Sequence, residues 1–429
     1  MTDLKHQPNN VHVVNVAARQ AAHKLHLRHG FPDLRVFMVA LIGFCVFLTV
    51  YATQALLPMF RDKFATSEFH VSLTVSATTI AIALGSPIVG LLAEKWGRRE
   101  VMIGSVSLLT IPILLAATSH SLNTLIGWRF VQGLIMPGII SVTMAYVSEE
   151  WASGGAAAVM AAYVAGNVLG GVTGRFLTGV VAAHWGWPAS FIVLATLNAI
   201  GAAIVWRWLP TATIPTKAVS LEAELREMLR HMRRPIMLAT FLAGAGVLFS
   251  LVGTFTYITF YLHEPPFHLG TAALGSLFGV YIVGVIVTPV AGRFIERLGH
   301  RRALMIAAVA AAFGVVLTLA PSLTAVVVGL AICSSAVFVC QSAAASYLGH
   351  IAGKSRASAA GLYSTFYYLG GTAGAAIPAL AWSHGGWPAC VLLIVLILAA
   401  VTILAFTFWR PVWIHPQTTA AAAAAVVGD

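Results

Sequence analysis

The same charged turn occurs twice in this chain, about two hundred residues apart, each time between long apolar segments. The two copies read GLLAEKWGRR at 90–99 and GRFIERLGHR at 292–301, an offset of 292 − 90 = 202 residues. A second repeat, GWPA at 186–189 and 386–389, has an offset of 386 − 186 = 200 residues. Self-similarity at a fixed spacing indicates an internal duplication. The chain is therefore expected to fold as two similar halves.

Composition places both halves in a lipid bilayer. Hydrophobic residues make up 59% of the 429 residues and charged residues only 9%, whereas soluble domains carry about 25% charged residues. The net charge of +11 does not indicate a nucleic-acid partner, because the basic residues occur in short turns rather than on one face. The four cysteines lie inside apolar segments without metal-ligand spacing. We therefore expect a lipid bilayer as partner, no nucleic acid and no metal.

Twelve apolar segments are long enough to cross a bilayer, six in each half. A helix needs about 20 apolar residues to span roughly 30 Å of hydrocarbon. The predicted fold class is an all-α membrane protein with twelve transmembrane helices in two pseudo-symmetric six-helix bundles. The predicted spans are 35–60, 71–93, 101–119, 122–148, 156–183, 188–209, 236–262, 271–295, 303–321, 323–348, 357–382 and 388–409.

Polar segments separate the two bundles and flank them. Between the bundles, LEAELREMLR at 221–230 has helical spacing with its charges on one face, which is typical of an amphipathic helix on a membrane surface. The N-terminal segment is polar and rich in histidine, and the C-terminal one is low in complexity. The predicted organisation is a disordered cytoplasmic tail at 1–34, a bundle at 35–209, a cytoplasmic linker at 210–235, a bundle at 236–410 and a cytoplasmic tail at 411–429.

The distribution of Lys and Arg predicts the orientation. With both termini in the cytoplasm, Arg61 and Lys63 lie outside and Arg129 and Arg175 lie within spans, so that 25 − 4 = 21 basic residues are cytoplasmic. Cytoplasmic loops are enriched in such residues. The N-terminal segment lacks a separate apolar core, so we expect no signal peptide. The sequence predicts a multi-pass membrane protein with both termini cytoplasmic.

The turn at 90–99 resembles the cytoplasmic signature of the major facilitator superfamily. RFVQG at 129–133 is similar to the Arg-x-x-x-Gly motif of its twelve-helix, drug:proton antiporter-like branch of bacterial efflux permeases, and the resemblance covers about 35–409. Glu94 and Lys95 stand where the signature more often has Asp and Arg, substitutions that keep the charges. The resemblance implies a location in the bacterial inner membrane. It also implies alternating access, in which two bundles rock about a central cavity. We expect a monomer.

A gating role is the hypothesis for the repeated turn. Its glycines permit a tight backbone turn, and its acidic residue is placed to face the positive end of the eleventh span. Its two arginines are placed to reach the acidic residues that end the fourth span, which would latch an outward-open state. The alternative is that these charges only fix the topology. The predicted charge network is Gly90, Glu94, Lys95, Gly97, Arg98, Arg99, Glu149, Glu150, Glu296 and Arg297.

The fifth span carries glycines at intervals of four on one face, which lets another helix approach closely. It resembles the antiporter-associated motif of that helix, although Gly replaces its Pro and Arg replaces its last Gly. The eighth span is the expected partner across the interface between the halves. A packing role alone is the alternative to a role in coupling. The residues assigned to this packing are Gly166, Gly170, Gly171, Gly174, Gly275 and Gly279.

Arg129 and Arg175 lie at a similar depth in adjacent spans, about 10–12 Å below the outer surface. A charge within a span is costly unless it is paired or faces water. None of the Asp, Glu or His residues falls in the middle of a predicted span. The missing counter-charge therefore arrives with an anionic or strongly polar substrate, or both arginines face a wet vestibule. For Arg129 the alternative is a structural arginine bound to backbone carbonyls.

The resemblance implies a substrate cavity near the midplane between the halves, lined mainly by the first, fourth, seventh and tenth spans with help from their neighbours. Aromatic and amide side chains there suit an apolar pocket with a few orienting hydrogen bonds. For the tyrosines, anchoring at the membrane interface is the alternative. The candidate cavity residues are Tyr51, Gln54, Arg129, Met136, Asn167, Arg175, Tyr257, Tyr281, Gln341 and Tyr367.

These features predict a secondary active transporter that moves a small organic molecule across the inner membrane by alternating access. The resemblance implies proton-coupled efflux, with the proton as the coupling ion and no cofactor. Proton symport for uptake and uniport of an anionic metabolite are alternatives. An integral membrane enzyme and a channel are disfavoured, because the sequence has no metal cluster, nucleophile-base pair, carboxylate pair or repeated polar ring. It also lacks a phosphate-binding loop motif, so direct coupling to ATP is not expected.

Overall fold

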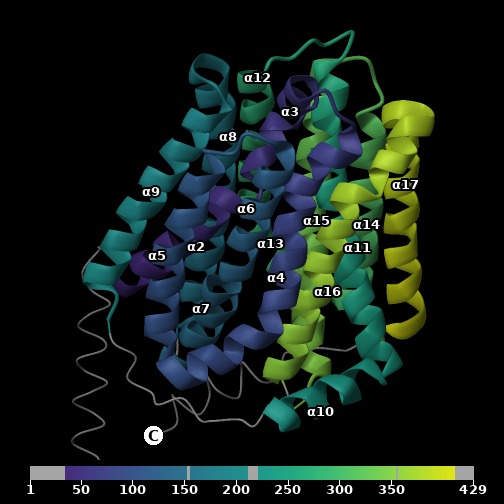
Figure 1. Ribbon diagram of the computed structural model, residues 1–429. Coiled ribbons are helices and arrows are strands. Elements are labelled where there is room, and N and C mark those ends of the chain that lie inside the picture. The colour runs from purple at the N-terminus through teal and green to yellow at the C-terminus, as the bar shows by residue number, and fades with distance from the viewer. Residues whose placement is uncertain (1–33, 152–154, 211–220, 354–355, 411–429) are drawn as a thin grey trace, which may run out of the picture.

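In a computed structural model, the chain forms two groups of helices that stand side by side (Figure 1). The structure describes residues 34–151, 155–210, 221–353 and 356–410. The tails and most of the polar segment before the linker helix α10 lie outside them, so the predictions made for those segments stay predictions. Figure 1 shows α10 across one end of the molecule and α3 near the other. We call these the α10 end and the α3 end.

The N-terminal half follows the predicted spans, with two interruptions. The first span breaks at Tyr51, where an α-helix passes into a short 3-10 helix. The fourth breaks at Met136 because Pro137, which has no N–H to donate, begins a new helix. The helices are α2 (Leu34–Val50), η1 (Ala52–Leu56), α3 (Leu57–Phe64), α4 (Glu68–Trp96), α5 (Arg98–Ala116), α6 (Leu122–Ile135), α7 (Pro137–Glu150), α8 (Ala156–Trp185) and α9 (Trp187–Trp208).

The C-terminal half repeats this order after the linker helix. Its second span is broken by a 3-10 turn, and its last helix contains non-helical dihedral angles at Gly385 and Gly386, where two helices meet at a kink. The elements are α10 (Leu221–Met232), α11 (Pro235–His263), α12 (Thr271–Leu277), η2 (Phe278–Val280), α13 (Tyr281–Leu298), α14 (His300–Leu317), α15 (Leu323–Ile351), α16 (Arg356–Ala376) and α17 (Pro378–Phe408).

The lengths of these helices suit a bilayer. Among the described residues, ten helical segments are long and apolar enough to cross a membrane. The shorter apolar segment Thr271–Gly284 continues into α13, and α16 continues into the start of α17; these two supply the remaining spans. Buried apolar side chains form one cluster that runs through both halves. The all-helical membrane fold predicted from the sequence is confirmed.

The repeated turn has the same backbone in both halves. Gly97 has φ 93° and Gly299 has φ 77°, a left-handed region that disfavours residues with a Cβ atom. Each glycine ends one helix by donating its N–H to the carbonyl four residues earlier, Ala93 or Ile295. The duplication seen in the sequence is therefore also a duplication of backbone geometry.

The glycine stripe of α8 packs against α2, which differs from the partner predicted for it. A Cβ atom at Gly170 would lie 2.2 Å from the Phe44 carbonyl oxygen. In the second half, a Cβ atom at Gly370 of α16 would lie 2.0 Å from the Ala245 carbonyl oxygen of α11. The stripe therefore joins the first and fifth spans of each half, because that is where two backbones approach most closely.

The predicted partners in the eighth span behave differently from one another. Gly275 contacts α8 at Gly179 rather than at the glycine stripe. The two backbones are so close there that a Cβ atom on either glycine would clash with the other. A Cβ atom at Gly279 would have no neighbour within 4 Å, so close packing does not require glycine there. Gly171 lies beside the Arg175 guanidinium, 3.1 Å from where its Cβ atom would be.

The halves meet along α4 and α16, and along α8 with α12 and α13. The Ser76 hydroxyl on α4 donates to the Thr372 carbonyl on α16 at 3.2 Å, and the hydroxyls of Thr79 and Thr372 lie 2.9 Å apart. Close to the α3 end, η1 and α3 also contact α11. The break at Tyr51 thus brings the end of the first span into the interface between the halves.

Candidate substrate site

Arg175 is the centre of a buried cluster at this interface. Its side chain extends from α8, its residue is only 5% exposed, and its Nε donates to Gln54 Oε1 at 2.8 Å. The guanidinium carbon lies 4.9 Å from the ring centre of Tyr51, 4.8 Å from that of Phe278 and 5.1 Å from that of Tyr281. Three aromatic rings within about 6 Å of a cation stabilise it through their negative faces. We call Arg175, Gln54, Tyr51, Phe278 and Tyr281 the arginine cage.

The arginine cage joins the two halves through one side-chain amide. Gln54, which is 1% exposed, accepts from Arg175 of its own half and donates from Nε2 to Thr256 Oγ1 of α11 at 3.0 Å. Tyr51 and Gln54 belong to the first half, whereas Phe278 and Tyr281 belong to the second. Any rocking of one half against the other must therefore change the surroundings of Arg175.

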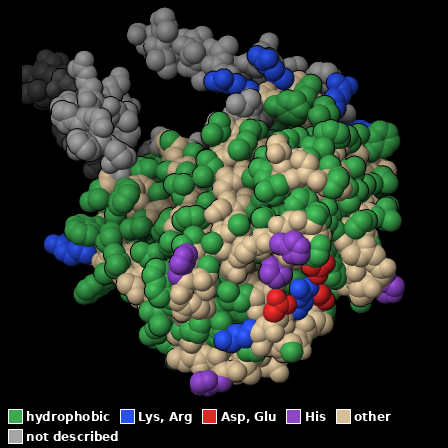
Figure 2. All heavy atoms as spheres, turned by 90° about the horizontal axis from the view of Figure 1, so that it is seen from above, with side chains coloured by type: hydrophobic (Ala, Val, Ile, Leu, Met, Phe, Trp, Pro, Cys, Tyr) green, Lys and Arg blue, Asp and Glu red, His purple; other side chains and the backbone are tan. Residues whose placement is uncertain are grey.

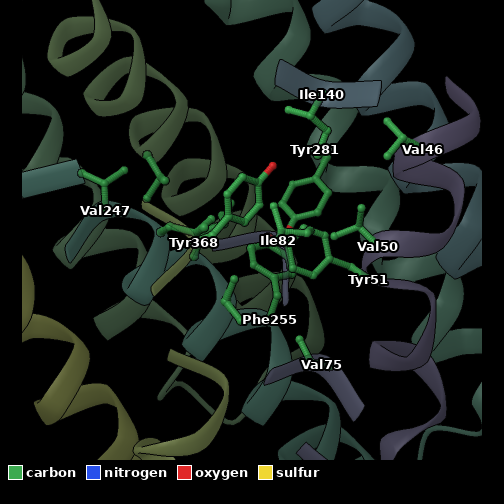
Figure 3. Packing of buried hydrophobic residues seen from close by; sticks show 14 of the residues in the cluster. Val46, Val50, Tyr51, Val75, Ile82, Ile140, Val247, Phe255, Tyr281 and Tyr368 are labelled. Atoms are coloured by element: carbon green, nitrogen blue, oxygen red, sulfur yellow. The ribbon is translucent and has the colours of Figure 1, made fainter. Parts of the chain in front are cut away.

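Further aromatic rings extend the arginine cage. The Tyr281 ring lies 4.5 Å from Phe255 and 5.8 Å from Phe338 between centroids. Figure 3 shows Tyr51, Tyr281, Tyr368 and Phe255 gathered where the two halves meet. On α16, the Tyr367 ring contacts that of Tyr368, with 5.7 Å between centroids. The site has an apolar aromatic wall with one fixed positive charge.

Arg129 has a different environment and acts as a structural clamp. It is fully buried, and its Nε donates to the Thr74 carbonyl at 3.1 Å. Its terminal nitrogens donate to the Thr49 carbonyl at 2.8 Å, to the Val50 carbonyl and to Gln132 Oε1 at 2.5 Å. The α2 helix ends at Val50, so these carbonyls belong to the last turn, which lacks helical partners. Arg129 supplies the donors that these carbonyls need. Its contacts therefore do not support the prediction that Arg129 lines the substrate cavity.

Four other candidate cavity residues are not part of the arginine cage. The Tyr257 hydroxyl donates to the Ala375 carbonyl at 2.8 Å, which joins α11 to α16. With its amide oriented to satisfy both polar atoms, Asn167 donates to the carbonyls of Tyr163 and Gly43, away from the arginine cage. Met136 is fully buried at the break in the fourth span, and Gln341 is partly buried on α15. The structure thus brings together Tyr51, Gln54, Arg175 and Tyr281 and separates them from these residues.

At the α10 end, the repeated turn forms one of the contacts expected from the sequence. Arg98 donates to Glu149 at 2.5 Å, which joins α5 to α7 within the first half. Arg99 instead donates to the Leu209 carbonyl at 2.8 Å. Lys95, Glu296 and Arg297 are exposed, and the side chains of Gly90 and Glu94 lie outside the described part of the chain. The gating role of this network stays a prediction.

At the α3 end, an ion pair and a histidine–carboxylate hydrogen bond join the two halves directly. Arg61 Nη1 lies 2.9 Å from Glu264 Oε1 and 3.1 Å from Glu68 Oε1. His263 Nε2 lies 3.2 Å from Asp62 Oδ2. Figure 2, which looks down on the α3 end, shows the acidic side chains of this face gathered beside a basic one, with histidines next to them. We call Arg61, Asp62, Glu68, His263 and Glu264 the crosswise cluster.

The duplication explains the geometry of the crosswise cluster. Arg61 and His263 are separated by 263 − 61 = 202 residues, and Asp62 and Glu264 by 264 − 62 = 202 residues, the same offset as the repeated turn. Each basic residue pairs with the acidic residue of the other half. The sequence contained this signal, since two charged dipeptides at one offset indicate a pair related by pseudo-symmetry.

The fold and the site together define a class of protein. Two pseudo-symmetric helical halves that enclose a binding site at their interface are typical of membrane transporters built from internal repeats. The chain belongs to the Major Facilitator Superfamily, whose family model matches residues 39–286 and 265–425. It is a secondary transporter of small molecules and not an enzyme.

Several relatives cover most of the chain. An uncharacterized MFS-type transporter of Bacillus subtilis (strain 168), YybF, is 30% identical over 365 residues, which cover 84% of this chain and 90% of that protein. The inner membrane transport protein YnfM of Escherichia coli (strain K12) is 28% identical over 367 residues, which cover 84% and 87%. A more partial match is a putative multidrug resistance protein of Salmonella typhi, MdtD, which is 25% identical over 194 residues, covering 44% and 41%.

Solved structures share the fold at low sequence identity. The nucleoside transporter NupG, in a mutant form, superposes with a TM-score of 0.69 at 14% identity and covers 88% of this chain and 99% of its own. A bacterial homologue of the human lysosomal transporter Spinster, in an inward-facing and occupied conformation, has a TM-score of 0.69 at 15% identity, covering 88% and 96%. At this identity the likeness concerns the fold alone.

Proposed function

We propose that this protein is a proton-coupled efflux transporter of the drug:proton antiporter-like branch, working as a monomer in the bacterial inner membrane. It moves a small organic molecule by alternating access of the arginine cage to the two sides. The partial similarity to a putative multidrug resistance protein supports export, and the inner membrane relative supports the location. The observation that carries the proposal is the crosswise cluster, which joins the two halves at the α3 end of the interface that also holds the arginine cage.

The orientation follows from charge. The α10 end carries the repeated basic turns and the basic residues of the linker helix, and the positive-inside rule assigns it to the cytoplasm. The α3 end is then external. In the proposed cycle, the crosswise cluster holds the halves together on the external side while the arginine cage is loaded from the cytoplasm, as the loading step of an exporter requires.

Protons arriving from outside meet the crosswise cluster first. Protonation of Asp62 or Glu264 removes the negative charge that holds His263 or Arg61 of the other half. The loss of these pairs favours the state that is open to the outside, in which the substrate is released. An inward proton gradient therefore promotes release on the external side.

Everted membrane vesicles test this coupling. The vesicles are energised to acidify the lumen, the pH gradient is recorded with a fluorescent dye, and aromatic acids, amides and amines are added one at a time. We expect at least one compound to dissipate the gradient when the intact protein is present, and the doubly substituted Asp62→Asn, Glu264→Gln variant to respond weakly. Lys63→Ala, which removes an exposed neighbouring charge, is the matched control. No response to any compound would contradict proton coupling.

A distance measurement tests the closure without a known substrate. Spin labels at Lys63→Cys and Gly270→Cys report the separation of the halves at the α3 end. Both positions are exposed, and the four native cysteines are buried, so labelling is selective. We expect the Asp62→Asn, Glu264→Gln background to lengthen the distance. An unchanged distance would show that the cluster does not hold the external side closed.

A further inference from the structure

Arg175 is a buried cation whose hydrogen-bonding capacity exceeds what the protein offers it. A guanidinium has five N–H donors. Its Nε donates to Gln54 and its Nη1 donates to the Gly171 carbonyl at 2.8 Å. The other three donors form no hydrogen bond within the described residues. No carboxylate in the described ranges forms an ion pair with Arg175 either.

Arg129 shows what a structural arginine looks like in the same half. Its four hydrogen bonds end on three backbone carbonyls and one side-chain amide, and all of its partners belong to the first half. Arg175, in contrast, faces aromatic rings from both halves and one amide that bridges them. The two arginines therefore have different roles. Arg129 donates to backbone carbonyls that would otherwise be unpaired, whereas Arg175 presents unused donors at the interface between the halves.

The unused donors specify the chemistry of a ligand. A guanidinium matches the two oxygens of a carboxylate, sulfonate or phosphate through parallel N–H···O bonds, and an organic acid would restore the charge balance that the protein leaves open. The rings of Tyr51, Phe278 and Tyr281 around the same guanidinium favour a flat apolar portion next to the acid group.

We propose that the transported substrate is a small aromatic organic anion whose acid group binds Arg175 inside the arginine cage. This inference rests on the proposed transport function and names its substrate class. The acid oxygens accept from the terminal nitrogens of Arg175, and the ring of the substrate lies among Tyr51, Phe278 and Tyr281. An exported anion also moves with the inside-negative membrane potential, which contributes to efflux in addition to the proton gradient.

The position of Gln54 connects binding to movement of the halves. An acid group on the terminal nitrogens of Arg175 neutralises the guanidinium charge and so weakens the Nε hydrogen bond to Gln54 Oε1. When Gln54 is released, the Gln54 to Thr256 hydrogen bond between the halves loses the partner that orients it. Substrate binding therefore weakens a contact that joins the halves in this structure, as a ligand that shifts a conformational equilibrium must do.

Binding to the full-length protein in lipid nanodiscs tests the substrate class. Naphthoate, naphthalene sulfonate and benzoate are titrated by calorimetry, with naphthamide and naphthylmethylamine as neutral and cationic matches. We expect at least one acid to bind about 10- to 100-fold more tightly than the amide, which is the worth of a charged hydrogen-bonded pair. A preference for the amide or the amine, or no binding by any acid, would overturn the proposal.

Substitutions then assign the effect to Arg175. Arg175→Gln should remove the preference for acid over amide, and Arg175→Lys should keep part of it because the charge remains without the planar fork. Arg207→Gln, at an exposed arginine on α9, is the control. An Arg175→Lys protein that elutes as a single folded species and binds amide and acid as the wild type does would also overturn the proposal, even if Arg175→Gln does not fold.

The vesicle experiment separates this inference from the transport proposal. If amines alone dissipate the pH gradient, proton-coupled export stands and the anionic substrate class is wrong. If an acid binds in an Arg175-dependent manner but no compound changes the gradient, the arginine cage stands as an anion site and proton coupling is wrong.

Discussion

The two halves share their packing but not their buried charge. Gly170 of α8 and Gly370 of α16 press against the backbone of the first helix of their own half in the same way. Two hundred residues after Arg175, however, the sequence has Ala375, and 330 − 129 = 201 residues after Arg129 it has Leu330. The two halves therefore share the close packing of a six-helix bundle, whereas the buried arginines of the first half have no counterparts in the second. The substrate site is therefore expected on the unshared residues.

The crosswise cluster lies between these two cases. Four of its five positions are shared by both halves, with Arg61 matched by His263 and Asp62 by Glu264. The charge pattern of the dipeptide is the same while the residue types differ. Because the positions are related by pseudo-symmetry, each basic group meets the acidic group of the other half, which a single dipeptide within one half would not achieve.

The largest expected effect comes from making the first half like the second at Arg129. Arg129→Leu copies the second half, but it removes the donors to Thr49, Val50 and Thr74 and leaves the Gln132 amide oxygen without its partner. Buried acceptors left unpaired cost about 1–3 kcal/mol each, so for these four acceptors we expect a loss of about 4 kcal/mol or more. The loss of stability is measured by thermal unfolding in detergent. Unfolding is monitored by the reaction of the buried cysteines with a thiol-specific dye.

Arg207→Leu is the matched control for that substitution. Arg207 is exposed on α9, so its replacement should change the unfolding temperature little. If both leucine variants unfold at the wild-type temperature, the carbonyls around Arg129 have other partners. The structural role assigned to Arg129 is then wrong.

The next effect tests whether the halves pack equally. Gly170→Ala and Gly370→Ala each place a Cβ atom within about 2 Å of a backbone carbonyl oxygen of the first helix, which neither backbone can avoid without moving apart. Overpacking of this kind costs about 1–3 kcal/mol, so we expect similar losses from the two variants. Gly104→Ala, at a glycine with no neighbour within 4 Å, is the control. A loss confined to one half would break the equivalence.

The repeated turn gives a smaller symmetric effect. Alanine at Gly97 or Gly299 must adopt a positive φ, which costs about 1–2 kcal/mol. At Gly97 the new Cβ atom also meets the Glu100 carboxylate, but that side chain is flexible and can move. We expect both variants to lower the unfolding temperature by a similar, modest amount in the same dye assay. A much larger loss at Gly97 would mean that Glu100 is held in place.

The sequence could predict the fold because hydropathy and duplication are local properties of the chain. The role of Arg129 could not be predicted in the same way, since it depends on the break at Tyr51, which exposes carbonyls that a continuous helix would have satisfied. The partner of the glycine stripe was predicted wrongly because a small face says that a helix can approach, not which one. The crosswise cluster was detectable, because Asp62 and Glu264 repeat at the offset of the turn.

The smallest expected effect on stability belongs to Arg175, and it sharpens the contrast with Arg129. Arg175→Met removes a desolvated charge and fills the space with a flexible apolar chain that packs well against aromatic rings. The lost cation–π contacts and the hydrogen bond to Gln54 are offset by the removal of an unpaired buried charge, and the bond from Gln54 to Thr256 is weakened but not removed. We expect the unfolding free energy to change by about 1 kcal/mol or less, whereas Arg129→Met should lose several times as much in the same dye assay. Equal losses from the two methionine variants would show that Arg175 is a structural clamp like Arg129, and the anion site would lose its basis.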